Sequence, residues 1–364
     1  MIKRIYFFVG TTTELIKLAP VIRELEKRQK DFKIITSGQT EVNFSELSFF
    51  IKKSSADLAF GEKVHKSSLY FFVIWFIKAL LQIPTLRQEF KGLNKHNSYF
   101  IVHGDPVSSL VGAVIAKFYN LKLVHIESGL RSFNFLEPFP EELCRLIISK
   151  LADVHFCPNE WSLNNLSKIG GVKINTVQNT QIESCLAALK NKAFDRNVLK
   201  FKEKNYFVLI IHRQEHVIFR KAESKRLIKF ILNQADKNIL CIFIRHATTY
   251  NFLKSVNFKL TSEQKKRVKF VSRLHYIDFV NLMNNSQFLI TDGGGNQEEA
   301  YYMGLPCLLI RNNTERIEGL GENAVLYNGN KHTIRSFMRS YKKYRRGKVK
   351  FRIRPSEIVV DYLR

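Results

Sequence analysis

The chain has 364 residues, of which 45% are hydrophobic and 25% are charged, and this composition excludes a collagen-like fibre, a disulfide-stapled miniprotein and a disordered tail. A single hydrophobic core usually stops growing at about this length, so two domains are expected. The 58 Lys and Arg residues against 32 Asp and Glu give a formal net charge of +26, which favours anionic partners such as nucleotides, nucleic acid or an acidic membrane surface.

Short apolar runs alternate with amphipathic stretches through the first half of the chain. Leucine and isoleucine recur at helical spacing from Leu15 to Leu25, and a second helix is predicted over Val107–Phe118. The predicted strands of this half, in chain order, are Arg4–Val9, Phe32–Thr36, Tyr99–Val102, Leu123–Ile126 and Val154–Cys157.

The second half repeats this alternation, with helical patterns such as Tyr276–Met283 between most strands. Its predicted strands are Tyr206–Ile211, Ile239–Ile244, Val268–Val271, Phe288–Thr291 and Cys307–Ile310. Continuously apolar strands separated by helices indicate parallel sheets covered on both faces. We therefore expect an α/β fold of two Rossmann-like, doubly wound domains that face an interdomain cleft. The expected bounds are 1–180 and 181–345, followed by a basic tail, 346–364, whose terminal helix returns toward the N-terminal domain.

Polar residues follow several predicted strands, and in such sheets ligands bind at the carboxyl ends of the strands. Asp105, Glu127 and Glu141 follow strands of the first half, and His212 follows a strand of the second. Carboxylates and a histidine in a shielded cleft can supply a base and an acid. Each also has a structural explanation: Asp105 and Glu141 suit helix starts, and His212 could be a buried core histidine. Their joint placement favours catalysis.

A glycine-rich turn, Gly293–Gly295, follows the strand that ends at Thr291. Glycines allow close backbone approach to a ligand, and a helix that starts there offers free N–H groups to a diphosphate. The alternative is an ordinary turn capped by Asp292. The segment lacks the Gly-Lys-Ser/Thr of a Walker loop and the spacing of a dinucleotide-binding fingerprint.

The cysteines and apolar runs bear on localisation. Five cysteines without a CxxC pair indicate a reducing compartment and argue against a disulfide framework or a zinc site. The N-terminal apolar run is too short for a signal peptide, and Leu69–Ile77 is shorter than the ~20 residues that span a bilayer. We expect a cytoplasmic protein, with peripheral attachment to the inner membrane face as the alternative.

Nine short motifs lie between Gly10 and about Gly329: GTTTELIKLAP, HGD, HIESGLRS, PFPEELCR, HRQEH, LHYIDFVNLM, TDGGGNQEEA, MGLPCLLIR and NTERIEG. In this order they resemble the UDP-N-acetylglucosamine 2-epimerase family. The resemblance implies a fold like that of GT-B glycosyltransferases, with a nucleotide sugar in the interdomain cleft and with neither cofactor nor metal. It also implies interconversion of UDP-GlcNAc and UDP-ManNAc, or of a related sugar pair, for surface polysaccharide synthesis. The family eliminates UDP to give a 2-acetamidoglucal and then adds UDP back.

The resemblance also assigns roles to residues. The implied catalytic set is Asp105, Glu127, Glu141 and His212, and spacing does not decide which acid is the base. The implied substrate-binding residues are Lys17, Arg131, Arg213, Gly294, Gly295, Glu299 and Arg316. Several positions depart from the family pattern, chiefly in the groups that would hold the ligand. This suggests a divergent branch that either acts on a different UDP-2-acetamido sugar or has weak activity. The departures, each with the residue that the family usually has there, are Thr12 and Thr13 (Arg-Pro), Thr40 (His), His216 (Asn), Gly293 (Ser) and Ile317 (Pro). The change at Thr12 removes a cation expected near the phosphates.

Three other functions remain open from the sequence. A GT-B glycosyltransferase would share the glycine-rich loop but would not need the acids together. A hydrolysing 2-epimerase differs in whether water reaches the glycal. A nucleic-acid- or membrane-binding protein is suggested by the charge and by the basic residues of Lys342–Arg354.

The apolar segment Leu69–Ile83 suggests a partner. A helix that is apolar on all sides must be covered by more than its own domain. A homodimer through N-terminal domain helices that include this segment is the leading expectation. An anionic membrane is the alternative, supported by Lys63, Lys66, Lys78 and the basic tail.

Overall fold

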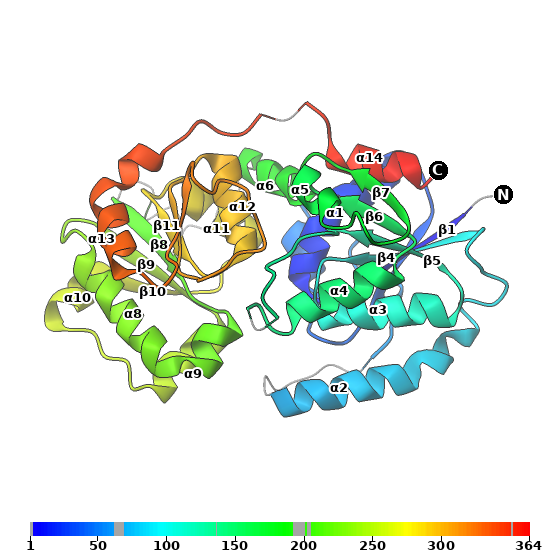
Figure 1. Ribbon diagram of the computed structural model, residues 1–364, viewed down its shortest axis with the longest axis horizontal. Helices are drawn as coiled ribbons and strands as arrows, with labels where there is room; N and C mark the ends of the chain where they lie inside the picture. The colour runs from blue at the N-terminus through cyan, green and yellow to red at the C-terminus, as the bar shows by residue number, and fades with distance from the viewer. Residues whose placement is uncertain (1–2, 62–68, 136, 192–200, 202–204, 351) are drawn as a thin grey trace. The chain divides into compact units, whose positions relative to one another are not determined.

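The computed structural model describes residues 3–61, 69–135, 137–191, 201, 205–350 and 352–364. The chain forms two compact units (Figure 1). Unit 1 comprises Met1–Ser184 and Phe351–Arg364, and unit 2 comprises Cys185–Lys350. The last segment of the chain therefore belongs to the same unit as the first.

Unit 1 is built on a seven-stranded parallel sheet in the order β3-β2-β1-β4-β5-β6-β7. Its strands are β1 (Arg4–Val9), β2 (Phe32–Thr36), β3 (Leu58–Ala59), β4 (Ser98–His103), β5 (Lys122–Ile126), β6 (Val154–Cys157) and β7 (Val172–Asn175). Its helices are α1 (Thr12–Lys27), α2 (Leu69–Gln82), α3 (Val107–Phe118), α4 (Glu141–Leu151), α5 (Glu160–Asn164), the start of α6 (Gln181–Lys190) and α14 (Pro355–Tyr362), with 3₁₀ turns η1 (Phe44–Leu47) and η2 (Ile83–Arg87).

Unit 2 has a six-stranded parallel sheet in the order β10-β9-β8-β11-β12-β13. Its strands are β8 (Tyr206–Ile210), β9 (Leu240–Arg245), β10 (Val268–Ser272), β11 (Leu289–Thr291), β12 (Cys307–Leu309) and β13 (Ala324–Leu326). Its other elements are α8 (Lys221–Gln234), α9 (Ala247–Ser255), α10 (Ser262–Arg267), α11 (Tyr276–Asn284), α12 (Gly294–Met303), α13 (Lys331–Ser340), the π-helical turn η3 (Glu215–Phe219) and the 3₁₀ turn η4 (Tyr341–Tyr344).

The two parallel sheets with helices around them confirm the α/β, Rossmann-like expectation. All ten predicted strands are present to within a residue or two at their ends. Aromatic side chains fill both cores: in unit 1 Phe8 and Phe100 are fully buried, and in unit 2 Phe207 stacks on Phe288 with ring centroids 4.8 Å apart. In each sheet the strand order reverses once, between β1 and β4 and between β8 and β11, and ligands bind at such points.

The C-terminal helix α14 packs against α1 within unit 1. Arg28 forms an ion pair with Asp361 at 2.6 Å, and the Ser356 backbone N–H and hydroxyl both donate to Glu183 at 2.8 Å. The basic segment that precedes α14 in the chain also makes contacts within unit 2, because Arg345 donates to the backbone carbonyls of Ser286 and Gln287, just after α11. Residues of the tail 346–364, and Arg345 just before it, therefore stabilise the fold itself.

Helix α2 buries one side against unit 1 and exposes apolar residues on another. Trp75 and Ala79 are almost fully buried, whereas Ile77 is 52% and Leu81 is 74% exposed. Lys63, Lys66 and the side chains of residues 69–73 lie outside the described part of the chain. Among the described residues, no helix combines the length and hydrophobicity needed to cross a membrane.

Candidate functional site

In unit 1 the candidate residues follow neighbouring strands at the reversal of strand order. Asp105 lies just beyond β4, Glu127 just beyond β5, and Lys17 in α1, the helix after β1. Because these strands are parallel and adjacent, their carboxyl ends meet at one sheet edge. The sheet topology thus explains why residues about 90 to 110 positions apart can share a site.

Glu127 is the most tightly held of the acids. Lys17 Nζ donates to Glu127 Oε1 at 2.9 Å and to Oε2 at 2.7 Å, and Asn179 Nδ2 donates to Oε2 as well. The Glu127 backbone has φ of +64°, a left-handed conformation that non-glycine residues adopt at a cost. The carboxylate also lies close to Gly104, where an added Cβ would be 3.1 Å from Glu127 Oε1. Glu127 is thus fixed beside the residue that precedes Asp105.

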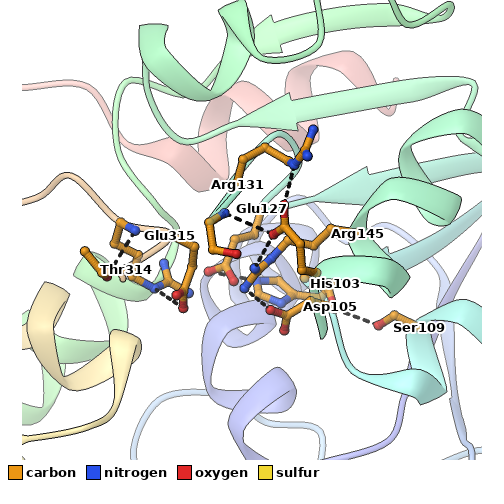
Figure 2. Close-up of polar contacts among 12 residues, drawn as sticks. His103, Asp105, Ser109, Glu127, Arg131, Arg145, Thr314 and Glu315 are labelled. Carbon is orange, nitrogen blue, oxygen red and sulfur yellow. Dashed lines mark hydrogen bonds and ion pairs between the residues drawn. The ribbon is translucent and has the colours of Figure 1, made fainter. Parts of the chain in front are cut away.

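Asp105 belongs to a chain of alternating charges. Arg145 joins Asp105 to Glu142: its Nη2 contacts Asp105 Oδ2 and its Nη1 donates to Glu142 Oε2 at 3.1 Å. Glu142 in turn accepts a 2.5 Å bond from Arg131 Nε. Figure 2 shows Arg145 in contact with Asp105. Burial opposes ionisation of Glu142, but the hydrogen bonds from Arg131 and from Ser132 N–H outweigh it and lower its pKa. This chain fixes the position of Asp105 relative to α4.

Glu141 begins α4 and is half-buried, one position before Glu142. Both Asp105 and Glu141 lie near Cys144, since burial first and then these two carboxylates raise the pKa of the Cys144 thiol to about 12. All three predicted catalytic acids, with Lys17 and Arg131, therefore lie at the same edge of unit 1. Within this set Lys17 contacts Glu127 and Arg131 contacts Glu142, so both cations hold carboxylates in place.

Glu14 is a buried acid that the sequence did not single out. Its carboxyl accepts a bond from Gly10 N–H at 3.0 Å and lies 3.0 Å from the Ser109 hydroxyl. That hydroxyl also lies 2.7 Å from the His103 carbonyl oxygen, and it has only one hydrogen to donate. Burial raises the pKa of Glu14 to about 7, which suits a neutral carboxyl that donates to Ser109.

In unit 2, His212 follows β8 and Asp292 follows β11, the neighbouring strand. Asp292 is fully buried and lies between two imidazoles: His212 Nδ1 is 3.0 Å from Oδ1, and His216 Nδ1 is 3.1 Å from Oδ2. It also accepts the backbone N–H groups of His212 and Arg213. Burial raises the pKa of Asp292, but the two histidines outweigh it and hold that pKa well below its usual range.

His212 stacks on His246 with ring centroids 5.1 Å apart. Burial, and then the neighbouring His212, lower the pKa of His246 to about 4, so His246 is neutral at physiological pH. The orientation of the His212 ring is therefore set by a carboxylate at one nitrogen and by a neutral ring on its face. This is the kind of support that an acid–base histidine requires.

The glycine-rich turn leads into α12, which begins at Gly294. A Cβ at Gly294 would lie 2.6 Å from Glu315 Oε1 and 3.0 Å from Arg316 Nε, so a larger residue there would displace these side chains. Arg316 forms an ion pair with Glu298 at 2.6 Å, and Arg311 pairs with Glu315 at 2.9 Å. Cations and helix N–H groups thus surround the turn, which is chemistry suited to a diphosphate.

Arg213 and Glu299 complete the predicted set in unit 2. Arg213 lies 3.6 Å from carboxylate oxygens of both Glu215 and Glu315. Glu299 is buried within α12, and Asn296 Nδ2 donates to its Oε2 at 3.1 Å. Unit 2 therefore brings together His212, Arg213, Gly294, Gly295, Glu299 and Arg316 around β8, β11 and α12. The interdomain cleft that would join these residues to the acids of unit 1 remains a prediction.

The sequence analysis missed the residues that support the candidate site. These are Glu14, Glu142, Arg145 and Asn179, with His103 beside Glu127. From the sequence, Asp292 is expected only as a cap of the glycine-rich turn; among the described residues no side chain caps α12, and Asp292 pairs with His212 instead. Only Glu142 and Arg145 carry a local signal, because residues three apart on a helix face the same way. The Asn179–Glu127 bond spans 52 positions, and no local pattern in the sequence predicts it.

Three comparisons bear on the identity of this fold and site. The chain matches the sequence profile of the UDP-N-acetylglucosamine 2-epimerase family over residues 23–350. It is 32% identical over 338 residues to a UDP-N-acetylglucosamine 2-epimerase of Methanococcus maripaludis, covering 90% of this chain and 88% of the relative. A crystal structure of the Methanocaldococcus jannaschii UDP-GlcNAc 2-epimerase in complex with UDP-GlcNAc and UDP superposes with a TM-score of 0.83 at 27% identity, covering 99% of each chain. A spinosyn forosaminyltransferase, 12% identical over 100% of this chain and 94% of its own, shares the fold with a TM-score of 0.57.

Proposed function

Because the chain belongs to the UDP-N-acetylglucosamine 2-epimerase family, we propose that it inverts carbon 2 of a UDP-2-acetamido sugar. The substrate pair is UDP-GlcNAc and UDP-ManNAc or a closely related pair, and the reaction uses no cofactor. The observation that carries this proposal is the supported acid set of unit 1, Asp105, Glu127 and Glu141, in a chain whose other unit holds His212 next to a diphosphate-type turn.

The reaction proceeds by elimination and re-addition. A base removes the proton from carbon 2, that electron pair forms a double bond to carbon 1, and the bond from carbon 1 to UDP breaks with its electrons leaving on UDP. The intermediates are a 2-acetamidoglucal and UDP. Re-addition returns UDP to carbon 1 and delivers a proton to the opposite face of carbon 2. Two proton-transfer groups on opposite faces are therefore required.

The surroundings of each residue support these roles. Asp105, Glu127 and Glu141 supply the carboxyl groups for proton transfer, and His212 acts at the departing diphosphate. Arg316, Arg213 and the N–H groups that open α12 stabilise the negative charge that develops on UDP. Glu299 binds the ribose. Lys17 and Arg131 bind the substrate in this proposal. In the structure they pair with Glu127 and Glu142, as Arg316 and Arg213 pair with Glu298 and Glu315.

Incubation with UDP-GlcNAc in deuterated water, followed by proton NMR, tests this function. We expect deuterium at carbon 2 and the appearance of the carbon-2 epimer, both linked to UDP. Release of UDP with a free 2-acetamido sugar would instead indicate the hydrolysing reaction. Turnover only after an acceptor is added would indicate a glycosyltransferase. No change in any of these assays would contradict the proposal.

We also propose that the protein acts as a homodimer through the exposed apolar face of unit 1, in the cytoplasm, where its product would enter surface polysaccharide synthesis. Helices α2 and α4 both pack against α3. They expose Ile77 and Leu81 on α2, and Leu143 and Ile147 on α4. Exposed apolar residues on two helices that both pack against α3 favour a protein–protein interface. Contact of this face with an anionic membrane is the alternative, and Lys78 would support it.

A further inference from the structure

Gly293 stands at the N-cap of α12, where serine, threonine, aspartate and asparagine are strongly preferred. Its backbone has φ of −91° and ψ of 125°, an extended conformation that any residue adopts. The backbone therefore gives no reason for glycine at this position. The reason must lie in the surrounding side chains.

Two side chains occupy the space that a residue-293 side chain would need. A Cβ at this position would lie 2.7 Å from Asn296 Oδ1 and 2.9 Å from His212 Cε1. Both distances are too short for carbon to approach without a shift of the neighbour. Glycine at 293 thus permits the observed positions of the Asn296 carboxamide and of the His212 ring.

The Asn296 carboxamide connects the turn to Glu299. Its Oδ1 accepts a bond from the Thr291 hydroxyl at 3.2 Å, and that hydroxyl accepts the Gly293 N–H at 2.9 Å. Its Nδ2 donates to Glu299 Oε2 at 3.1 Å. One side chain therefore fixes both the start of α12 and a buried carboxylate one helical turn further on.

We propose that Asn296 is a positioning residue of the nucleotide site, and that Gly293 is glycine in order to leave room for it. Asn296 orients Glu299 toward the ribose and holds the N–H groups of Gly294 and Gly295 toward the diphosphate. This inference rests on the proposed function, because the binding of a nucleotide by Glu299 and by the glycine-rich turn is part of that proposal. It explains why the serine that the family pattern places at 293 can be absent.

A purely structural role for Asn296 is the competing explanation, since residues three apart on a helix often pair. The two explanations differ in what they change. A structural role lowers the melting temperature of the variants and leaves the affinity of the folded protein for UDP intact. A positioning role weakens UDP binding by the folded protein.

The test is a double-mutant cycle in the full-length protein, with UDP affinity measured by calorimetry and folding followed by thermal unfolding. We expect Asn296→Ala to raise the Kd for UDP about tenfold, the usual effect of losing one hydrogen bond to a charged group. Gly293→Ser should raise it at least as much, because its Cβ displaces Asn296 and presses on His212. The Kd of the double variant Gly293→Ser/Asn296→Ala should be about tenfold lower than the value expected if the effects of the two single substitutions were additive.

Asn296→Asp separates the two hydrogen bonds of the carboxamide. It keeps the acceptor for Thr291, but it cannot donate to Glu299 and adds a negative charge beside it. We expect it to bind UDP more weakly than Asn296→Ala does. Equal or stronger binding than Asn296→Ala would show that the bond to Glu299 is unimportant and would overturn the proposal.

Two substitutions in unit 2 serve as matched controls. Gly347→Ser adds the same side chain where nothing lies within 4 Å, and Asn238→Ala removes an exposed carboxamide. Both should leave the Kd for UDP unchanged. If folded Asn296→Ala binds UDP with unchanged affinity, or if the two substitutions are strictly additive, this inference is overturned. The proposed function would still stand in that case, provided that the wild-type protein is an active epimerase. A wild-type protein that neither binds UDP nor converts UDP-GlcNAc would overturn both.

Discussion

At the scale of single residues, the predicted acids differ in how their neighbours hold them. Lys17 donates to both oxygens of the Glu127 carboxylate and Asn179 donates to Oε2, and the Glu127 backbone is held in a left-handed conformation. Within the described part of the chain, Asp105 forms an ion pair with one cation, Arg145, which it shares with the buried Glu142. Glu127 is thus fixed in position, whereas Asp105 keeps more of its carboxylate available for proton transfer.

Removing the charge of either acid should slow the reaction and spare the fold. We expect Asp105→Asn and Glu127→Gln each to lower kcat by about 10²-fold or more, the usual size of a general acid–base contribution, with UDP affinity largely retained. Asp153→Asn is the matched control, because Asp153 also pairs with cations in unit 1, Lys95 and Lys117, but lies before β6, at the opposite end of the strands. Full epimerase activity in both acid variants would refute the acid–base assignment.

The buried carboxyl of Glu14 should make the free energy of unfolding depend on pH. Burial raises the pKa of the Glu14 carboxyl to about 7 in the folded protein, from its ordinary value of 4.5. The folded state therefore binds more protons than the unfolded state between these pH values, and the contribution of Glu14 to stability falls as pH rises through this window. Glu14→Gln keeps the shape and cannot ionise. We expect the stability of wild type relative to Glu14→Gln to fall by about 3 kcal/mol from pH 4.5 to 7 and then to level off.

Urea unfolding of both proteins across this pH range measures that difference directly. Glu322→Gln, which neutralises an exposed carboxyl of unit 2, is the control and should follow wild type more closely. A difference between wild type and Glu14→Gln that stays constant from pH 4.5 to 7, or that grows with pH, would show that Glu14 is ionised in the folded protein.

At the scale of elements, the sequence predicts the central strands well because they are buried on both faces and read as continuous apolar runs. It misses β3, β7 and β13, which are short edge strands with partly exposed residues. It locates the strand ends that carry Asp105, Glu127 and His212, since these follow the apolar runs directly. It does not locate Asn179 or Asp292 as partners, because those bonds join residues 52 and 80 positions apart.

The start of α1 leads to a prediction that differs from what the family pattern suggests. The pattern places arginine at Thr12, so Thr12→Arg would be expected from sequence to tighten UDP binding. In the structure Thr12 is buried, and its hydroxyl accepts the Asn43 N–H at 3.0 Å and contacts the Glu41 carbonyl oxygen at 3.3 Å. We now expect Thr12→Arg to destabilise the protein by about 1–2 kcal/mol through loss of these bonds, without tightening UDP. Thr13→Arg, at the exposed next position, is the control for added charge.

Thermal unfolding and calorimetry with UDP distinguish the two expectations for Thr12. A lower melting temperature for Thr12→Arg, with Thr13→Arg close to wild type, would support the structural role of the threonine hydroxyl. A wild-type melting temperature combined with tighter UDP binding would show that the loop over residues 40–43 moves aside and that a cation is missing from this site.

At the scale of the whole molecule, each unit assembles its share of the candidate site by the same rule. The acids of unit 1 lie beyond β4 and β5, and His212 and Asp292 of unit 2 lie beyond β8 and β11, so both sets follow strands at a reversal of strand order. Parallel sheets place these ends at one edge whatever the loop sequences are. This is why strand-end polarity identifies candidate site residues, whereas the exposed apolar residues of α2 and α4 lead to the proposal about assembly.

The apolar face of α2 and α4 leads to a prediction about assembly, and the structure decides which residue tests it. Trp75 would seem a natural choice from sequence, but it is only 4% exposed and belongs to the core of unit 1, so Trp75→Glu would unfold the unit. Leu81 is 74% exposed on the same helix. We expect Leu81→Glu to shift the protein from dimer to monomer, because a carboxylate buried in an apolar interface without a partner costs several kcal/mol.

Light scattering coupled to gel filtration measures that shift, and Val172→Glu, which alters an exposed apolar residue of β7, is the matched control that should remain dimeric. The membrane alternative makes a different forecast: wild type would be monomeric, would sediment with vesicles that contain anionic lipid and would be released by salt, since charge attraction to such lipid is screened. A wild-type protein that is monomeric and does not bind the vesicles would contradict both the homodimer and the membrane contact. In that case Ile77 and Leu81 would be exposed apolar residues without a partner, and the dimer would be no part of the function.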